Sequence, residues 1–180
     1  MFYKQNKSKN FTPGFIMVLH TFGRDLKWNP HIHCLITEGD YSGDGFWKGV
    51  HHFNYTFLRN AFRTALLNEM ETILGPSFKK VKAKCYTEHK QGFYVYAKPN
   101  KCDPNAVTKY IGRYLGRPVI ATSRIDKYDG GQVTFHYNRH EDDTYVVETI
   151  PAMEFIQRLI RHIPEKHSKM IRYGGLYARH

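Results

Sequence analysis

The chain has 180 residues, 41% of them apolar and 24% charged, which is the composition of a globular domain with a full core. A chain that is mainly a disordered tail is therefore excluded. Lysine and arginine number 27 against 16 acidic residues, so the formal net charge is +11, and 15% of the residues are aromatic. Basic residues interleaved with aromatic ones favour single-stranded nucleic acid as the partner over a membrane surface, because bases stack on rings while cations follow the phosphates.

The cysteines and the first residues indicate the setting of the protein. Cys34, Cys85 and Cys102 are odd in number and far apart, without the spacing of a zinc finger or a disulfide framework, which fits a reducing, cytoplasmic setting. No long apolar stretch opens the chain, so we expect neither a secretory signal nor a membrane span. Residues 1–13 are polar and basic and are expected to form a loose arm. With no repeat and no linker, residues 1–180 are predicted to form a single domain.

A wide antiparallel hairpin is predicted first along the chain. The apolar run 15–21 predicts a strand, residues 22–30 a return loop and residues 31–37 the partner strand. Because residues i and i+2 of a strand point to the same face, His31 and His33 aim two imidazoles at one spot. Such a pair suits a divalent cation, although it is also typical of two half-exposed strand histidines.

A third protein ligand would help to hold a metal ion at this pair. The hairpin brings His20, near the end of the first strand, towards His31 and His33, so His20 is the first candidate. Asp25 and Glu38 are the runners-up. A buried histidine satisfied by a neighbouring group is an equally good interpretation of His20.

The middle of the chain is predicted to hold one long helix and one strand. Residues 38–45 have the composition of a loop, and residues 54–74 carry apolar side chains at helical spacing and end at a Gly-Pro pair. The lysine run at 79–84 is expected to be a solvated face, although it could also contact phosphate. Residues 93–97 predict a strand, which ends at Lys98 in a position to contact DNA.

A short helix is predicted over residues 103–116, with an aspartate N-cap, a proline in the first turn and a glycine at the end. Tyr110 and Tyr114 differ by about 40° around its axis, so both hydroxyls lie on one face. The same spacing gives a basic stripe beside the tyrosines, formed by Lys109, Arg113 and Arg117. The tyrosines also fit the apolar stripe of an amphipathic helix, in which most tyrosines simply pack.

The last third of the chain predicts three strands and a helix. Residues 119–125, 132–137 and 144–149 have strand patterns, and an Asp-Gly turn signal precedes the second of them. Residues 151–163 predict a helix, and residues 164–180 are less regular. The side chains expected on the packing side of that helix are Met153, Ile156, Leu159, Ile160 and Ile163.

A phosphodiester transesterification needs three parts that this sequence offers. They are two histidines for a metal, two tyrosines on one helix face and a basic stripe. The metal polarises the scissile phosphate, a phenolate attacks it, and the cations hold the strand. The motifs continue in a fixed order over nearly the whole chain, at residues 19–26, 29–33, 95–99, 110–114, 121–125, 133–135, 155–158 and 171–176. In this order they resemble the catalytic domain of the HUH-type, two-tyrosine rolling-circle transposases of the ninety-one family of insertion sequences.

The resemblance implies an α+β fold, in which a central antiparallel sheet carries the histidines and one of the flanking helices presents the tyrosines. It implies Mg²⁺ or Mn²⁺ held by His31, His33 and His20, and single-stranded DNA, at transposon ends and target, as partner. Tyr110 or Tyr114 would attack to give a 5′-phosphotyrosine and a free 3′-hydroxyl, and the other tyrosine would accept a second strand. The side chains expected to bind the DNA are Lys98, Lys109, Arg113, Arg117 and Arg124.

Family members usually carry a cysteine-rich segment before this region, and none precedes Met1, so we expect the catalytic domain alone or a short relative. Two other functions are compatible with the composition. A non-catalytic single-strand-binding module would need no metal and would leave the strand intact. A metal-dependent nuclease that uses water would cleave without either tyrosine. A homodimer is compatible with the sequence, but nothing in the sequence requires one.

Overall fold

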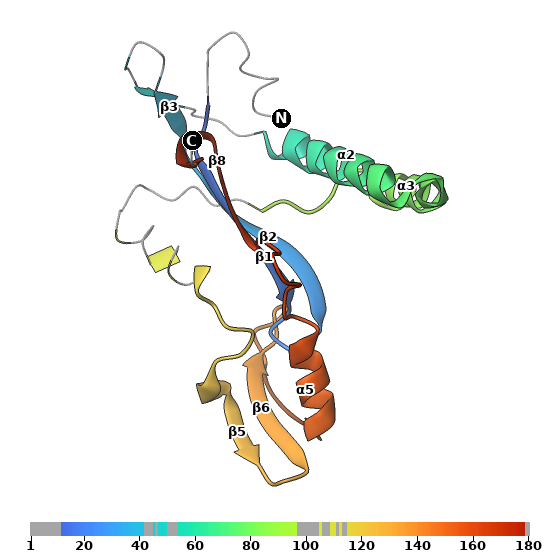
Figure 1. Cartoon of the computed structure of the whole chain (residues 1–180), viewed down its shortest axis with the longest axis vertical. Coiled ribbons are helices and arrows are strands. Elements are labelled where there is room, and N and C mark those ends of the chain that lie inside the picture. The colour runs from blue at the N-terminus through green and yellow to red at the C-terminus, as the bar shows by residue number, and fades with distance from the viewer. Residues whose placement is uncertain are drawn as a thin grey trace. The chain divides into compact units, whose positions relative to one another are not determined.

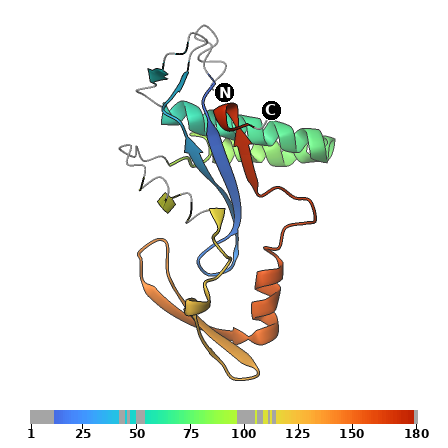
Figure 2. The same ribbon diagram turned by 60° about the vertical axis from the view of Figure 1, so that its left-hand side comes forward.

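The computed structural model shows an α+β fold, as predicted, built from antiparallel sheets and helices (Figures 1 and 2). The chain divides into two compact units, one of residues 1–13 and 38–101 and one of residues 14–37 and 102–180. The prediction of a single domain stays a prediction. The residues that the structure describes are 12–41, 45, 47–49, 54–96, 105, 109–110, 112 and 115–178. The predicted basic arm lies almost entirely outside them.

The predicted histidine hairpin is confirmed in the second unit. Strands β1 (Phe15–Phe22) and β2 (Trp28–Ile36) pair in antiparallel register. A third strand, β8 (Ile171–Gly174), pairs with β1 and completes the order β2-β1-β8 (Figure 1). At the end of β8, a Cβ on Gly174 would lie 2.0 Å from the ring of Phe15, so any larger residue here would require that ring to move.

A second three-stranded sheet, in the order β5-β6-β7, follows in the same unit. Strands β6 (Gln132–Asn138) and β7 (Tyr145–Pro151) confirm two predicted strands, and Asp129 Oδ1 accepts hydrogen bonds from two following backbone amides at the predicted turn. The prediction of a strand over 119–125 is wrong. The 3₁₀ turn Thr122–Arg124, closed by a hydrogen bond between backbone groups, comes first, and β5 spans Ile125–Tyr128.

Helix α5 (Ala152–Ile160) packs on this second sheet, but through another face than the predicted one. Phe155 is buried, with its ring 5.5 Å from that of Phe135, and Leu159 packs beside it. The helix has two apolar stripes, and the sheet covers the one that carries the aromatic ring. The predicted packing residues that instead lie exposed are Met153, Ile156, Ile160 and Ile163. The buried cluster between sheet and helix consists of Leu26, Val133, Phe135, Ile150 and Phe155.

The first unit contains the predicted long helix, α2 (Tyr55–Leu74), which is capped by Asn54. Part of the predicted loop before it forms a short hairpin of β3 (Gly39–Tyr41) and β4 (Trp47–Gly49). The lysine run lies in a further helix, α3 (Lys79–Glu88), which follows the 3₁₀ turn Pro76–Phe78. Lys82 in that helix bonds Glu71 of α2 at 2.6 Å, so this cation stabilises a helix pair.

The strand predicted over 93–97 is absent at residues 93–96, which the structure describes. Here the backbone amide of Phe93 donates to the carbonyl of Arg59 in α2, and the Arg59 guanidinium lies 5.6 Å from the centre of the Tyr94 ring. The alternating side chains of this segment therefore pack on helix α2 and do not mark a strand. None of the helices within the described ranges has the length and apolar character needed to cross a bilayer.

Candidate metal centre

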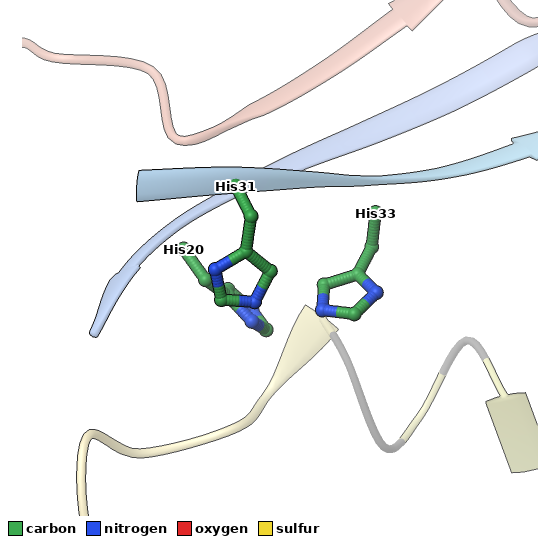
Figure 3. A group of neighbouring side chains, drawn as sticks. All are labelled: His20, His31 and His33. Carbon is green, nitrogen blue, oxygen red and sulfur yellow. The ribbon is translucent and has the colours of Figure 1, made fainter. Parts of the chain in front are cut away.

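Three histidines meet on one face of the β1–β2 hairpin (Figure 3). His20 on β1 lies directly opposite His31 on β2, and residues opposite each other in an antiparallel pair share a face. His33 follows His31 by two residues and points to the same side. The register of one hairpin therefore brings together the two predicted ligands and the first candidate for a third.

The spacing of the three rings fits a single metal ion. The ring centres lie 4.8 to 5.6 Å apart, and one ligand nitrogen from each ring lies within 4.8 Å of the other two. Nitrogens bound to one ion at about 2.1 Å lie roughly 3 to 3.5 Å from each other. Small rotations of the rings would close that difference. His20 is buried, whereas His31 and His33 are half-buried and open towards solvent.

A backbone carbonyl fixes the orientation of His31. Its Nδ1 lies 2.7 Å from the carbonyl oxygen of Asn29. Because a carbonyl oxygen only accepts hydrogen bonds, Nδ1 carries the proton and Nε2 presents its lone pair. An imidazole held in this way is the usual arrangement of a histidine that ligates a metal.

His33 is held in its neutral form. Its pKa is lowered from 6.5 to about 4, chiefly by burial and in addition by the positive charges of His20, His31 and Arg117. Neutral imidazole is the form that binds metal ions, so His33 is in the form needed for ligation at neutral pH.

In the protein kept metal-free by a chelator, the ring of His33 is expected to titrate near pH 4. An unfolded histidine titrates near 6.5, so between these values the unfolded chain binds more protons than the folded protein. The free energy of unfolding therefore falls as the pH drops from 6.5 towards 4. An NMR titration of the ring signals, assigned with His33→Gln, measures the midpoint. A midpoint near 6.5 would contradict the effect of burial.

The carboxylates considered as third ligands do not join the histidines. Among the described residues, the group able to hold a metal consists of the three histidines alone. Asp25 instead accepts a hydrogen bond from the backbone of Lys27 in the return loop. Three imidazoles without a carboxylate are a donor set that suits Mn²⁺ better than Mg²⁺, which prefers oxygen ligands.

The predicted tyrosine helix is described only in part. Tyr110 has helical backbone and is half-buried, and Lys109 is exposed. The side chains predicted to act here that lie outside the described residues are Tyr114, Lys98 and Arg113. The shared face of the two tyrosines therefore stays a prediction. Arg117 lies just beyond the helix and is close enough for its charge to lower the pKa of His33. Figure 3 shows the pale yellow ribbon of this part of the chain beside the three rings.

A basic pocket of about 460 Å³ lies in the same unit. Arg124 is fixed there by a hydrogen bond from Nε to the carbonyl of His136 at 2.9 Å and by a second one to the carbonyl of Arg24. Burial and the charges of Arg117 and Arg24 lower the pKa of Arg124. The residues that line the pocket are Arg24, Arg117, Arg124, His136, Tyr137, Asn138 and Asp143. Three guanidinium groups against one carboxylate leave a net positive pocket that suits a phosphate.

Two of these arginines, Arg117 and Arg124, were predicted from the sequence, whereas Arg24 was not. It lies in the return loop of the hairpin and forms an ion pair with Asp143 at 3.1 Å. The one signal for it was its place within the family-like segment 19–26, because nothing in the local pattern shows that this loop meets the second sheet.

Comparison with known proteins places the chain in a family. The family model described as "Putative transposase" matches residues 14–180. The chain is 30% identical to the transposase for insertion sequence element IS801 of Pseudomonas savastanoi pv. phaseolicola, over 96% of this chain and 45% of that relative. It is also 30% identical to "Putative transposase y4qJ" of Sinorhizobium fredii, over 90% of this chain and 45% of that protein.

The chain thus spans a little under half the length of these two relatives. No solved structure matches it. The family match covers nearly the whole chain and agrees with the resemblance predicted from the order of the motifs. The chain therefore belongs to the family of insertion-sequence transposases that includes the transposase of IS801.

Proposed function

We propose that this chain is a metal-dependent single-stranded DNA endonuclease and strand transferase that acts in DNA transposition through a tyrosine. The observation that carries the proposal is the group of three histidines on one face of the hairpin, beside the charge of Arg117. Membership of a transposase family supports DNA as the substrate. The exposed half of the site and the basic pocket in the same unit support access for a strand.

In this proposal, His20, His31 and His33 hold one divalent cation, Mn²⁺ or Mg²⁺, and their nitrogen donors favour the former. When bound, such a cation supplies Lewis-acid stabilisation of the charge on the phosphate oxygens. The carbonyl of Asn29 keeps His31 in the ligating tautomer, and burial keeps His33 neutral.

The reaction proposed for the tyrosines is a transesterification. The hydroxyl of Tyr110 or Tyr114 loses its proton, and its oxygen attacks the phosphorus atom. The bond from phosphorus to the 3′ oxygen breaks, this oxygen takes up a proton, and the 5′ phosphate remains on the tyrosine. The second tyrosine would carry out a second transfer. Because a free tyrosine has a pKa of about 10, cations near the attacking oxygen are needed at neutral pH.

Basic side chains would hold the strand on both sides of the scissile phosphate. Arg117, Arg124 and Arg24 line one pocket, in which guanidinium groups can bind a neighbouring phosphate in two-pronged fashion. The predicted contacts from Lys109 and Arg113 would extend this surface along the tyrosine helix, and Lys98 remains a predicted contact of the strand. A phosphate-binding surface of this kind makes the affinity fall with rising salt.

A denaturing-gel assay with single-stranded oligonucleotides of varied sequence, labelled at either end, tests the proposal. With Mn²⁺ we expect a covalent adduct of protein with the downstream fragment, and with EDTA no cleavage. Cleavage without an adduct would favour water as the nucleophile. Tight binding with an intact strand at every sequence and with either metal would favour the binding module.

A further inference from the structure

The pairing of β1 and β2 slips by one residue beside the metal centre. His20 pairs with His31, but Phe22 pairs with Trp28, so two residues of β2 lie opposite one residue of β1. Such a bulge changes which way the following side chains point. By simple alternation from His31, Trp28 would face away from the histidines.

The bulge reverses this expectation. Phe22 follows His20 by two residues, and the two rings stack with their centres 5.1 Å apart, so both are on the same face. Trp28 lies opposite Phe22 and shares its face. The indole of Trp28 is therefore on the face of the sheet that carries the three candidate ligands.

A fixed histidine supports one side of the indole. His162, which follows α5, is buried and bonds Thr21 Oγ1 at 3.0 Å and the carbonyl of Leu26 at 2.9 Å. The Trp28 ring lies nearly parallel to it, at 7° and 6.0 Å between centres. Because the supporting ring is bonded at both nitrogens, the plane of the indole is set in advance.

The rest of the indole is open. Trp28 is 60% exposed, whereas its pairing partner Phe22 is buried. A large flat ring that is held in place and exposed beside basic groups is what proteins use to stack unpaired bases. The basic pocket includes Arg24 of the same return loop, so phosphate and base contacts are available from one short segment.

We propose that Trp28 is a stacking platform for one unpaired nucleobase of the strand whose phosphate is held at the metal centre. The inference rests on the proposed function, since it takes single-stranded DNA as the ligand. It adds a residue and a contact that the catalytic parts do not include. A base inside a duplex offers no free face, so this contact selects single strands over duplex DNA.

Fluorescence tests the proposal without any change at Trp28. Trp47, on β4, is the other tryptophan, so Trp47→Phe leaves Trp28 as the only one. In EDTA, where the strand is not cut, we expect a single-stranded oligonucleotide to quench the emission of Trp28. Trp28→Leu is expected to weaken binding about tenfold, whereas Trp28→Phe retains most of the affinity and the matched control Trp47→Leu retains all of it.

Oligonucleotides with an abasic nucleotide at each position in turn locate the base that stacks on Trp28. In the unchanged protein, one abasic position is expected to weaken binding about tenfold, and in Trp28→Leu the same position is expected to have no effect. If emission does not change on binding, or if no abasic position couples to Trp28, the stacking proposal is wrong while the proposed function stands. If no single-stranded oligonucleotide binds at all, both proposals fall.

Discussion

Changing both Tyr110 and Tyr114 to phenylalanine is expected to lower adduct formation and strand cleavage by at least about a thousandfold, because the attacking oxygen is lost. Phenylalanine keeps the ring, so packing around the half-buried Tyr110 is retained. Binding of single-stranded DNA in EDTA is expected to change by less than about twofold, because phosphate contacts and stacking remain. The gel assay gives the first quantity and fluorescence anisotropy the second.

Single variants and a matched control sharpen this result. Tyr128→Phe removes a hydroxyl from an exposed tyrosine of β5 and is expected to leave cleavage unchanged. If one single variant abolishes the first cleavage and the other does not, the first nucleophile is identified. Cleavage at the original rate in the double variant would contradict the tyrosine mechanism and favour water.

Removal of one candidate ligand is expected to weaken metal binding strongly. His31→Ala deletes a half-buried ring whose Nε2 faces the other histidines, and we expect Mn²⁺ affinity to fall by at least about a hundredfold. Even partners that only orient a ligand are worth about 10–100-fold, and a ligand is worth at least as much. Isothermal titration calorimetry with Mn²⁺ measures the loss, and cleavage is expected to disappear with it.

His140→Ala is the matched control for this change, because His140 is exposed in the turn between β6 and β7. It is expected to bind Mn²⁺ as the unchanged protein does. Binding of single-stranded DNA in EDTA is expected to survive in both variants. Equal Mn²⁺ affinity in His31→Ala and His140→Ala would rule out the three histidines as the metal centre.

The histidine site was predictable from sequence because it depends on local rules. His31 and His33 share a face through strand alternation, and a hairpin return of ordinary length brings His20 opposite them. The choice of His20 over Asp25 as the third candidate ligand needed the register, since the return loop also offers Asp25. The turn at Asp129 was predictable for the same local reason.

Features that depend on distant contacts were not predictable. Strand β8 has four residues, too few for a pattern, and its pairing with β1 brings Gly174 against the ring of Phe15. The stretch at 93–96 alternates as a strand does, yet its backbone bonds to a helix. Arg24 carries no signal of the pocket that it lines. Alternation alone also gives the wrong face of the sheet for Trp28, because it does not reveal the bulge.

Because of the bulge in β2, the number of residues in this hairpin decides which side chains share a face. Asn29 and Pro30 are its two residues, and a proline is tolerated there because a bulged position need not donate to the ladder. The carbonyl of Asn29 sets the tautomer of His31, and the extra residue turns Trp28 to the face of the three histidines. Deleting one residue would undo both at once. The number of residues between Trp28 and His31 therefore matters to this hairpin apart from which side chains those residues carry.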